Sequence, residues 1–141
     1  MGRVAALAAL CFSLLFAACA APWASAGGVK VQVSMREYTI SPDKTQVRPG
    51  NVTFDAHNAG SMTHEMVVLR TDLPALSIPT APDGTADEEA SGVKNVGEVS
   101  ELSPGESKSV TLNLAPGRYL LVCNLPGHLR QGMWAELRVT S

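Results

Sequence analysis

The sequence predicts an all-β fold, a β-sandwich of about seven to eight short strands. Two observations favour this class. Stretches of alternating apolar and polar residues recur along the chain, and clusters of Pro, Gly, Asn and Ser separate them. Long amphipathic helical patterns and internal repeats are absent from the sequence. We therefore expect a single small sandwich rather than a helical or mixed fold.

The first 26 residues have the plan of a secretory signal peptide. Arg3 is their one charge, an apolar stretch follows, and Ala24-Ser25-Ala26 offers a small-residue cleavage site. The apolar stretch is shorter than the roughly 20 residues of a membrane span. We expect an exported protein, in the periplasm or another extracytoplasmic compartment. In the alternative, Cys19 is lipid-modified and anchors a lipoprotein to a membrane.

Cleavage after Ala26 leaves residues 27–141, which is the size of one domain. Removing Arg3 from the 11 basic residues leaves 10 against 13 acidic ones, so the net charge becomes −3 with histidine neutral. This mild acidity gives no support for nucleic-acid binding. We expect a monomeric domain.

Cysteine usage constrains the chemistry further. Cys11 and Cys19 leave with the signal peptide, so Cys123 remains alone. A lone thiol in an oxidising compartment is either a small buried apolar residue or a thiolate held by a metal. The surroundings of Cys123 in the sequence favour the metal.

The expected strands follow from period-two alternation, and turn signals such as Ser103-Pro-Gly105 lie between them. In chain order they are residues 29–35, 38–40, 52–57, 64–68, 109–114, 119–123 and 133–139. Residues 119–123 are apolar on both faces, which is typical of a central strand. Alternation places His57 on the solvent face. It also places Met133 inward and Trp134 on the opposite face, where we expect it to pack against the sheet.

A long polar connection runs from Thr71 to Gly97 and carries several acidic residues. Its Thr85-x-x-Glu88 pattern matches a capping box and predicts a helical turn near residues 85–90. The acidic cluster is interpreted as a solvated face, with a partner-docking patch as the alternative. Connections of this length are usually functional or mobile.

Cys123, His128 and Met133 share one loop between two expected strands, in the pattern C-x4-H-x4-M. Thiolate and thioether are soft ligands, and two histidines, one cysteine and a weak axial methionine make a blue-copper centre. The second histidine is then His64, at the start of a strand. Met62 and Met66 are alternative thioethers, which we interpret as loop packing and core. Zinc competes for the site but rarely takes thioether, and haem is disfavoured because C-x-x-C-H is absent.

The run Gly117-x-Tyr119-x-x-x-Cys123, with His128 and Gly132-Met133 after it, resembles the copper loop of the cupredoxins, the plastocyanin and azurin family. Asn58-Ala-Gly60 before the first histidine is similar too. The resemblance implies a Greek-key β-sandwich and one copper ion that shuttles one electron between Cu(I) and Cu(II). The ligands it implies are His64, Cys123, His128 and Met133.

Two features depart from the plastocyanin pattern. The spacing from Cys123 to His128 is two residues longer than in plastocyanin. Glu65 follows the first histidine, where plastocyanin and azurin carry an asparagine that helps to fix the copper loop. Both departures bear on the rigidity and the reduction potential of the site.

The predicted function is that of a one-electron carrier with transient redox partner proteins, and not of an enzyme. A multicopper catalytic centre needs more histidines, and only His57 remains beyond the two proposed ligands. Signatures of a catalytic triad, a P-loop or a dinucleotide site are absent from the sequence. The alternative is a copper-handling protein for delivery or protection, because Met62 and Met66 lie near His64 and thioethers suit Cu(I).

Overall fold

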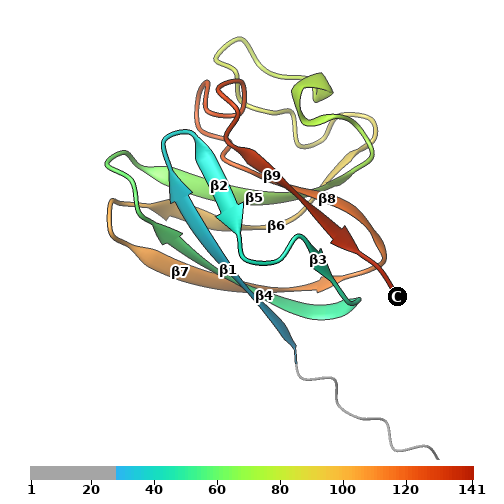
Figure 1. Cartoon of the computed structure of the whole chain (residues 1–141). Coiled ribbons are helices and arrows are strands. Elements are labelled where there is room, and N and C mark those ends of the chain that lie inside the picture. Colours follow the sequence, from blue (N-terminus) through green and yellow to red (C-terminus); the bar gives the residue numbers. More distant parts are fainter. Residues whose placement is uncertain (1–27) are drawn as a thin grey trace, which may run out of the picture.

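The computed structural model describes residues 28–141 and contains two packed β-sheets. The predicted signal peptide, its cleavage site and Cys19 lie outside the described residues. One sheet has the strand order β2-β1-β4-β7 and the other β3-β9-β8-β5-β6 (Figure 1). The predicted β-sandwich is confirmed, and neighbours distant in sequence, such as β5 and β8, give it a Greek-key character.

The strands are β1 (Val29–Arg36), β2 (Thr39–Pro42), β3 (Gln46–Val47), β4 (Gly50–Asn58), β5 (His64–Thr71), β6 (Val93–Leu102), β7 (Ser107–Leu114), β8 (Gly117–Val122) and β9 (Trp134–Val139). One 3-10 turn, η1, spans Ala75–Ser77. Strand β1 pairs in parallel with β4 and β3 in parallel with β9, while the other pairs are antiparallel.

The main core lies between the sheets, as the alternation predicts. In β1 the buried residues are Val31, Val33 and Met35, and in β4 every second residue from Val52 to Asn58 is buried. Met133 and Cys123 belong to the same cluster, so the inward direction of Met133 is confirmed. Burying side chains of this size contributes roughly 1.5–3 kcal/mol each. The loop that carries Cys123, His128 and Met133, here called the ligand loop, is therefore attached to the main core.

A second apolar cluster covers the outer face of the five-stranded sheet, which explains why β8 is apolar on both faces. Its buried members are Val67, Leu69, Ala75, Ile78, Ala86, Leu120, Val122 and Leu129. Trp134 packs against it, on the opposite face from Met133, as predicted. The covering residues come from the long connection after β5 and from the ligand loop, which lie together at one end of the molecule (Figure 1).

The helical turn expected near residues 85–90 is not formed, and the prediction was wrong. Thr85 donates through its backbone and hydroxyl to Asp83 Oδ1, at 3.0 and 2.8 Å. Glu88 accepts from the side-chain amides of Asn95 and Asn124, at 2.5 and 2.7 Å. Both residues of the expected capping box thus have other partners. The one helical turn of the connection is η1, ten residues earlier in the chain.

Strands β3 and β6 were not predicted. The expected connection to Gly97 in fact ends at Val93, where β6 begins. Register irregularities in the pairing of β5 with β6 interrupt the period-two pattern. Gly97 lies at one of them with φ 147°, and a Cβ there would approach Leu112 Cδ2 to 2.4 Å. Close packing across the sandwich therefore requires glycine at this point. Because glycine is unfavourable within strands, the sequence pattern did not indicate β6.

Within residues 28–141, no helix has the length and apolar character needed to cross a membrane.

Candidate metal centre

The topology brings the predicted ligands to one end of the five-stranded sheet. His64 is the first residue of β5, and Cys123 follows the last residue of β8. Because β5 and β8 are antiparallel neighbours, with Val67 opposite Val122, these two ends meet. The turn between β8 and β9 then supplies His128, and Met133 directly precedes β9.

Three donor side chains converge in the interior. The donor atoms of His64, Cys123 and His128 all lie within 4.8 Å of one another. Cys123 Sγ is 3.3 Å from His128 Nδ1, and the two imidazole rings are 5.3 Å apart between centroids. His64 and Cys123 are fully buried, and His128 is 7% exposed. Within residues 28–141 this is the one such group of three or more His, Cys, Asp or Glu side chains.

The ring nitrogens of His64 test whether the site fits a metal. Both are buried, and neither has a hydrogen-bond partner among the described residues. An unpaired buried polar group costs about 1–3 kcal/mol, so native structures rarely leave one without a purpose. A metal ion beside Cys123 Sγ and His128 Nδ1 would provide a partner for one of these two nitrogens. The donor set therefore fits one copper ion.

Met133 is fully buried and tied to both loop ligands through its backbone. Cys123 N donates to Met133 O at 3.0 Å, and Met133 N donates to His128 O at 3.1 Å. Its side chain belongs to the core cluster that contains Cys123. This placement suits a thioether that completes the donor set.

The electrostatics of the site favour metal-binding forms of the imidazoles. Burial lowers the pKa of His64 and the pKa of His128, so both rings are held neutral. Burial raises the pKa of the Cys123 thiol, so a metal ion must displace its proton on binding. Glu65 N points at Cys123 Sγ from 3.5 Å and supplies a dipole to the resulting thiolate.

The connection between β5 and β6 braces the ligand loop, that is, it holds the loop between β8 and β9 in place through hydrogen bonds and close contacts. Asn124 follows Cys123 and pairs with both backbone groups of Ala86: Ala86 N donates to Asn124 Oδ1 at 2.5 Å, and Asn124 Nδ2 donates to Ala86 O at 3.2 Å. A Cβ on Gly84 would lie 3.1 Å from Gly127 N, so the two loops touch. Arg130 also bonds the Thr80 hydroxyl. Sequence reasoning missed this brace, because no local pattern links residues 38 positions apart.

Glu65 stands where plastocyanin and azurin carry an asparagine. It is a half-buried acid beside the metal site. Burial, and after it the nearby carboxylates of Glu98, Glu88 and Glu101, together raise its pKa to about 6. A raised carboxyl pKa means that folding favours the protonated acid. Below the ordinary value of 4.5 both states are protonated and the effect vanishes, while above about 6 the full destabilisation is present.

We therefore expect Glu65→Gln to stabilise the copper-free protein at pH 7 by about 1 kcal/mol, after allowance for solvent screening. At pH 4 the two proteins should unfold alike. Urea denaturation at both pH values measures the difference. Glu89→Gln, at an exposed position, is the control for the loss of one carboxylate. An equal gain at pH 4 and pH 7 would contradict the electrostatic explanation.

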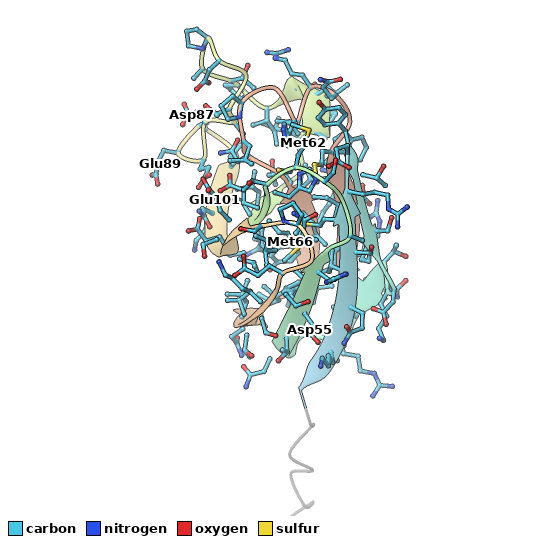
Figure 2. All side chains as sticks on the ribbon, turned by 90° about the vertical axis from the view of Figure 1, so that its left-hand side faces the viewer. Asp55, Met62, Met66, Asp87, Glu89 and Glu101 are labelled. Carbon is cyan, nitrogen blue, oxygen red and sulfur yellow. The ribbon has the colours of Figure 1, made fainter. Side chains whose placement is uncertain are left out.

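The remaining histidine and the nearby methionines are placed as follows. His57 is exposed, as predicted, and its Nδ1 lies 2.9 Å from Ser107 Oγ. Met66 is buried in the core between the sheets, as expected. Met62 is 43% exposed, so its interpretation as loop packing was wrong. Figure 2 shows Met62 toward the end of the molecule that carries the loops and Met66 deeper among the strands.

We expect His57→Ala to leave the copper stoichiometry and the visible spectrum unchanged, because its ring faces solvent on the other sheet. Metal analysis and absorption spectroscopy measure both. His64→Ala is the matched control and should lose the coloured site. Loss of copper in His57→Ala, with colour retained in His64→Ala, would reverse the assignment.

The chain was compared with known proteins. The family model described as the sulfocyanin (SoxE) domain matches residues 47–141. Sulfocyanin of Sulfolobus acidocaldarius is 32% identical over 82 residues, which is 57% of this chain. The chain matches 41% of the length of that relative.

Solved structures resemble the fold at low sequence identity. Reduced auracyanin of Roseiflexus castenholzii superposes with a TM-score of 0.62 at 20% identity, covering 82% of this chain and 100% of that one. Auracyanin A of Chloroflexus aurantiacus, described as a blue copper protein, gives 0.58 at 22% identity, covering 81% and 100%. Rusticyanin of Thiobacillus ferrooxidans gives 0.53 at 20% identity, covering 81% and 79%.

The family match spans most of the chain and includes His64, Cys123, His128 and Met133. The sandwich and the buried donor set agree with it. The chain belongs to the sulfocyanin (SoxE) domain family and is a cupredoxin.

Proposed function

We propose that the protein is an exported one-electron carrier that holds one type 1 copper ion through His64, Cys123, His128 and Met133. The observation that carries this proposal is the convergence of three buried donors within 4.8 Å, two of them imidazoles held neutral by burial. The export rests on the signal-peptide plan of residues 1–26. The protein serves as a carrier and not as an enzyme.

The residues around the donors suit fast electron transfer. Bound copper supplies a one-electron change between Cu(II) and Cu(I). The chain keeps the donors in place through that change: Cys123 and His128 bond to the backbone of Met133, and Asn124 is tied to Ala86. A donor set that cannot rearrange has little to reorganise when an electron arrives or leaves.

His128 is the ligand at which electrons enter and leave in this proposal. Its 7% exposure contrasts with the full burial of His64 and Cys123. Pro126 is exposed in the same loop, and the ring of Tyr38 lies edge-on to His128 at 5.1 Å. A small apolar surface of this kind suits a redox partner protein that docks briefly and leaves.

A copper-handling role is the second candidate. The observation that favours it is Met62, whose thioether is 43% exposed two residues before ligand His64. Exposed thioether suits the capture or release of Cu(I).

The visible spectrum of the oxidised, copper-loaded protein tests the carrier. We expect an intense thiolate-to-copper charge-transfer band, one copper per chain and a reversible one-electron wave in voltammetry. Copper should stay bound when a Cu(I) chelator is added at equimolar concentration. A colourless protein that yields its copper to the chelator would overturn the carrier in favour of copper handling.

A further inference from the structure

The turn between β1 and β2 reaches both imidazoles of the centre from the opposite sheet. Glu37 Oε1 lies 3.6 Å from His64 Nε2, and the Tyr38 ring stacks edge-on against His128. In Figure 1 this turn lies at the same end of the molecule as the loop between β8 and β9. Sequence reasoning assigned no role to Glu37.

We propose that Glu37 is a positioning residue for ligand His64 and that its negative charge stabilises the oxidised state of the copper centre. The inference rests on the proposed copper site and goes beyond it, because it names the group outside the donor set that lowers the reduction potential.

The carboxylate is held in place by the loop that leads into His64. Glu37 Oε1 accepts hydrogen bonds from Met62 N at 2.6 Å and from Ser61 N at 2.7 Å. The Ser61 hydroxyl adds a longer bond of 3.3 Å. Backbone N–H groups of Glu37 itself, Met62 and Ser61 lower the pKa of Glu37 to about 2. The side chain therefore carries its charge at neutral pH and cannot easily turn away.

The position of this charge defines the roles of the two ring nitrogens of His64. Nε2 faces the carboxylate, which favours the tautomer with the proton on Nε2. Nδ1 is then left for the metal, and it is also the nitrogen that His128 presents toward Cys123. A separation of 3.6 Å is an ion-pair distance and too long for a hydrogen bond, so the interaction is mainly electrostatic.

The turn that carries Glu37 contacts both histidines: the carboxylate lies 3.6 Å from His64 Nε2, and the ring of the next residue, Tyr38, lies edge-on to His128. A negative charge held this close to a ligand favours Cu(II), which carries one more positive charge than Cu(I). The carboxylate side chain is 26% exposed, so solvent screens part of the interaction.

Glu37→Gln tests the charge while it keeps an oxygen that can accept from Ser61 and Met62. We expect the ratio of Cu(II) to Cu(I) affinity to fall about tenfold, which raises the reduction potential by about 59 mV for one electron. Cyclic voltammetry at pH 7 measures the shift. Glu106→Gln is the matched control, because Glu106 also accepts a backbone N–H, from Ser103, and has no ion pair with either ligand histidine.

Gly60→Ala gives a second, independent variant that leaves the carboxylate in the chain. A Cβ at Gly60 would lie 2.7 Å from Glu37 Oε2 and 2.8 Å from Oε1, so the carboxylate must move away. We expect a rise in potential in the same direction as for Glu37→Gln, and smaller. This variant decides the question if Glu37→Gln does not fold.

The outcomes separate this inference from the proposed function. A wild-type protein without the charge-transfer band would overturn the copper carrier itself. With the band present, the inference is overturned if Glu37→Gln and Gly60→Ala keep the wild-type potential, or if Glu106→Gln shifts it as much. A rise in both variants with no change in the control supports it.

Discussion

Replacing Cys123 with serine should abolish the visible charge-transfer band of the copper-loaded protein and leave the sandwich folded. The band requires a thiolate, and a serine hydroxyl is a hard, weakly acidic group that copper does not deprotonate readily at neutral pH. The substitution nearly conserves volume at a fully buried position. A buried hydroxyl costs about 1–3 kcal/mol, which a core of this extent tolerates.

Visible absorption, copper analysis and far-ultraviolet circular dichroism measure colour, stoichiometry and fold. Met66→Leu is the matched control. Met66 is a fully buried, sulfur-containing residue of the same core, two positions after His64, and it is not assigned as a ligand. This variant should keep the band. A coloured Cys123→Ser protein, or a colourless Met66→Leu protein, would contradict the ligand assignment.

The copper loop could be predicted because its information is local. Cys123, His128 and Met133 are spaced within one loop, and period-two alternation fixes which way Met133 points. His64 lies far away in the sequence. It was predicted from the need for a second nitrogen ligand and from the small number of histidines. In the structure, the pairing of β5 with β8 brings His64 to the end of the sheet where Cys123 lies.

The support around the ligands could not be predicted from the sequence. Asn124 binds backbone groups of Ala86, and any residue at position 86 offers the same two groups. Glu37 likewise binds backbone N–H groups of Ser61 and Met62. Such contacts leave no complementary pattern in the side chains, and they depend on how two sheets face each other. The failed helical turn has a related cause: Glu88 accepts from the side-chain amides of Asn95 and Asn124, which lie outside the local window from which the turn was predicted.

Met133→Leu should keep copper and colour but raise the reduction potential. The axial thioether contributes weakly to holding the ion and more to stabilising Cu(II), so its loss favours Cu(I). We expect an increase of about 60–120 mV, which corresponds to one to two tenfold steps in the ratio of affinities. Leucine has a similar volume at this fully buried site, so the stability cost should stay below about 1.5 kcal/mol.

The same substitution separates a carrier from a copper-handling protein. In a carrier, wild type and Met133→Leu both give reversible one-electron waves and both retain copper against a Cu(I) chelator. In a handling protein, Met133→Leu mainly weakens the retention of Cu(I), and the oxidised form is difficult to populate even in the wild type.

Met62→Leu is the control that discriminates further, because Met62 is the exposed thioether beside the site. A carrier keeps its potential and its copper transfer rate in this variant, whereas a handling protein exchanges copper more slowly. An irreversible wild-type wave, together with slowed transfer in Met62→Leu, would assign the protein to copper handling.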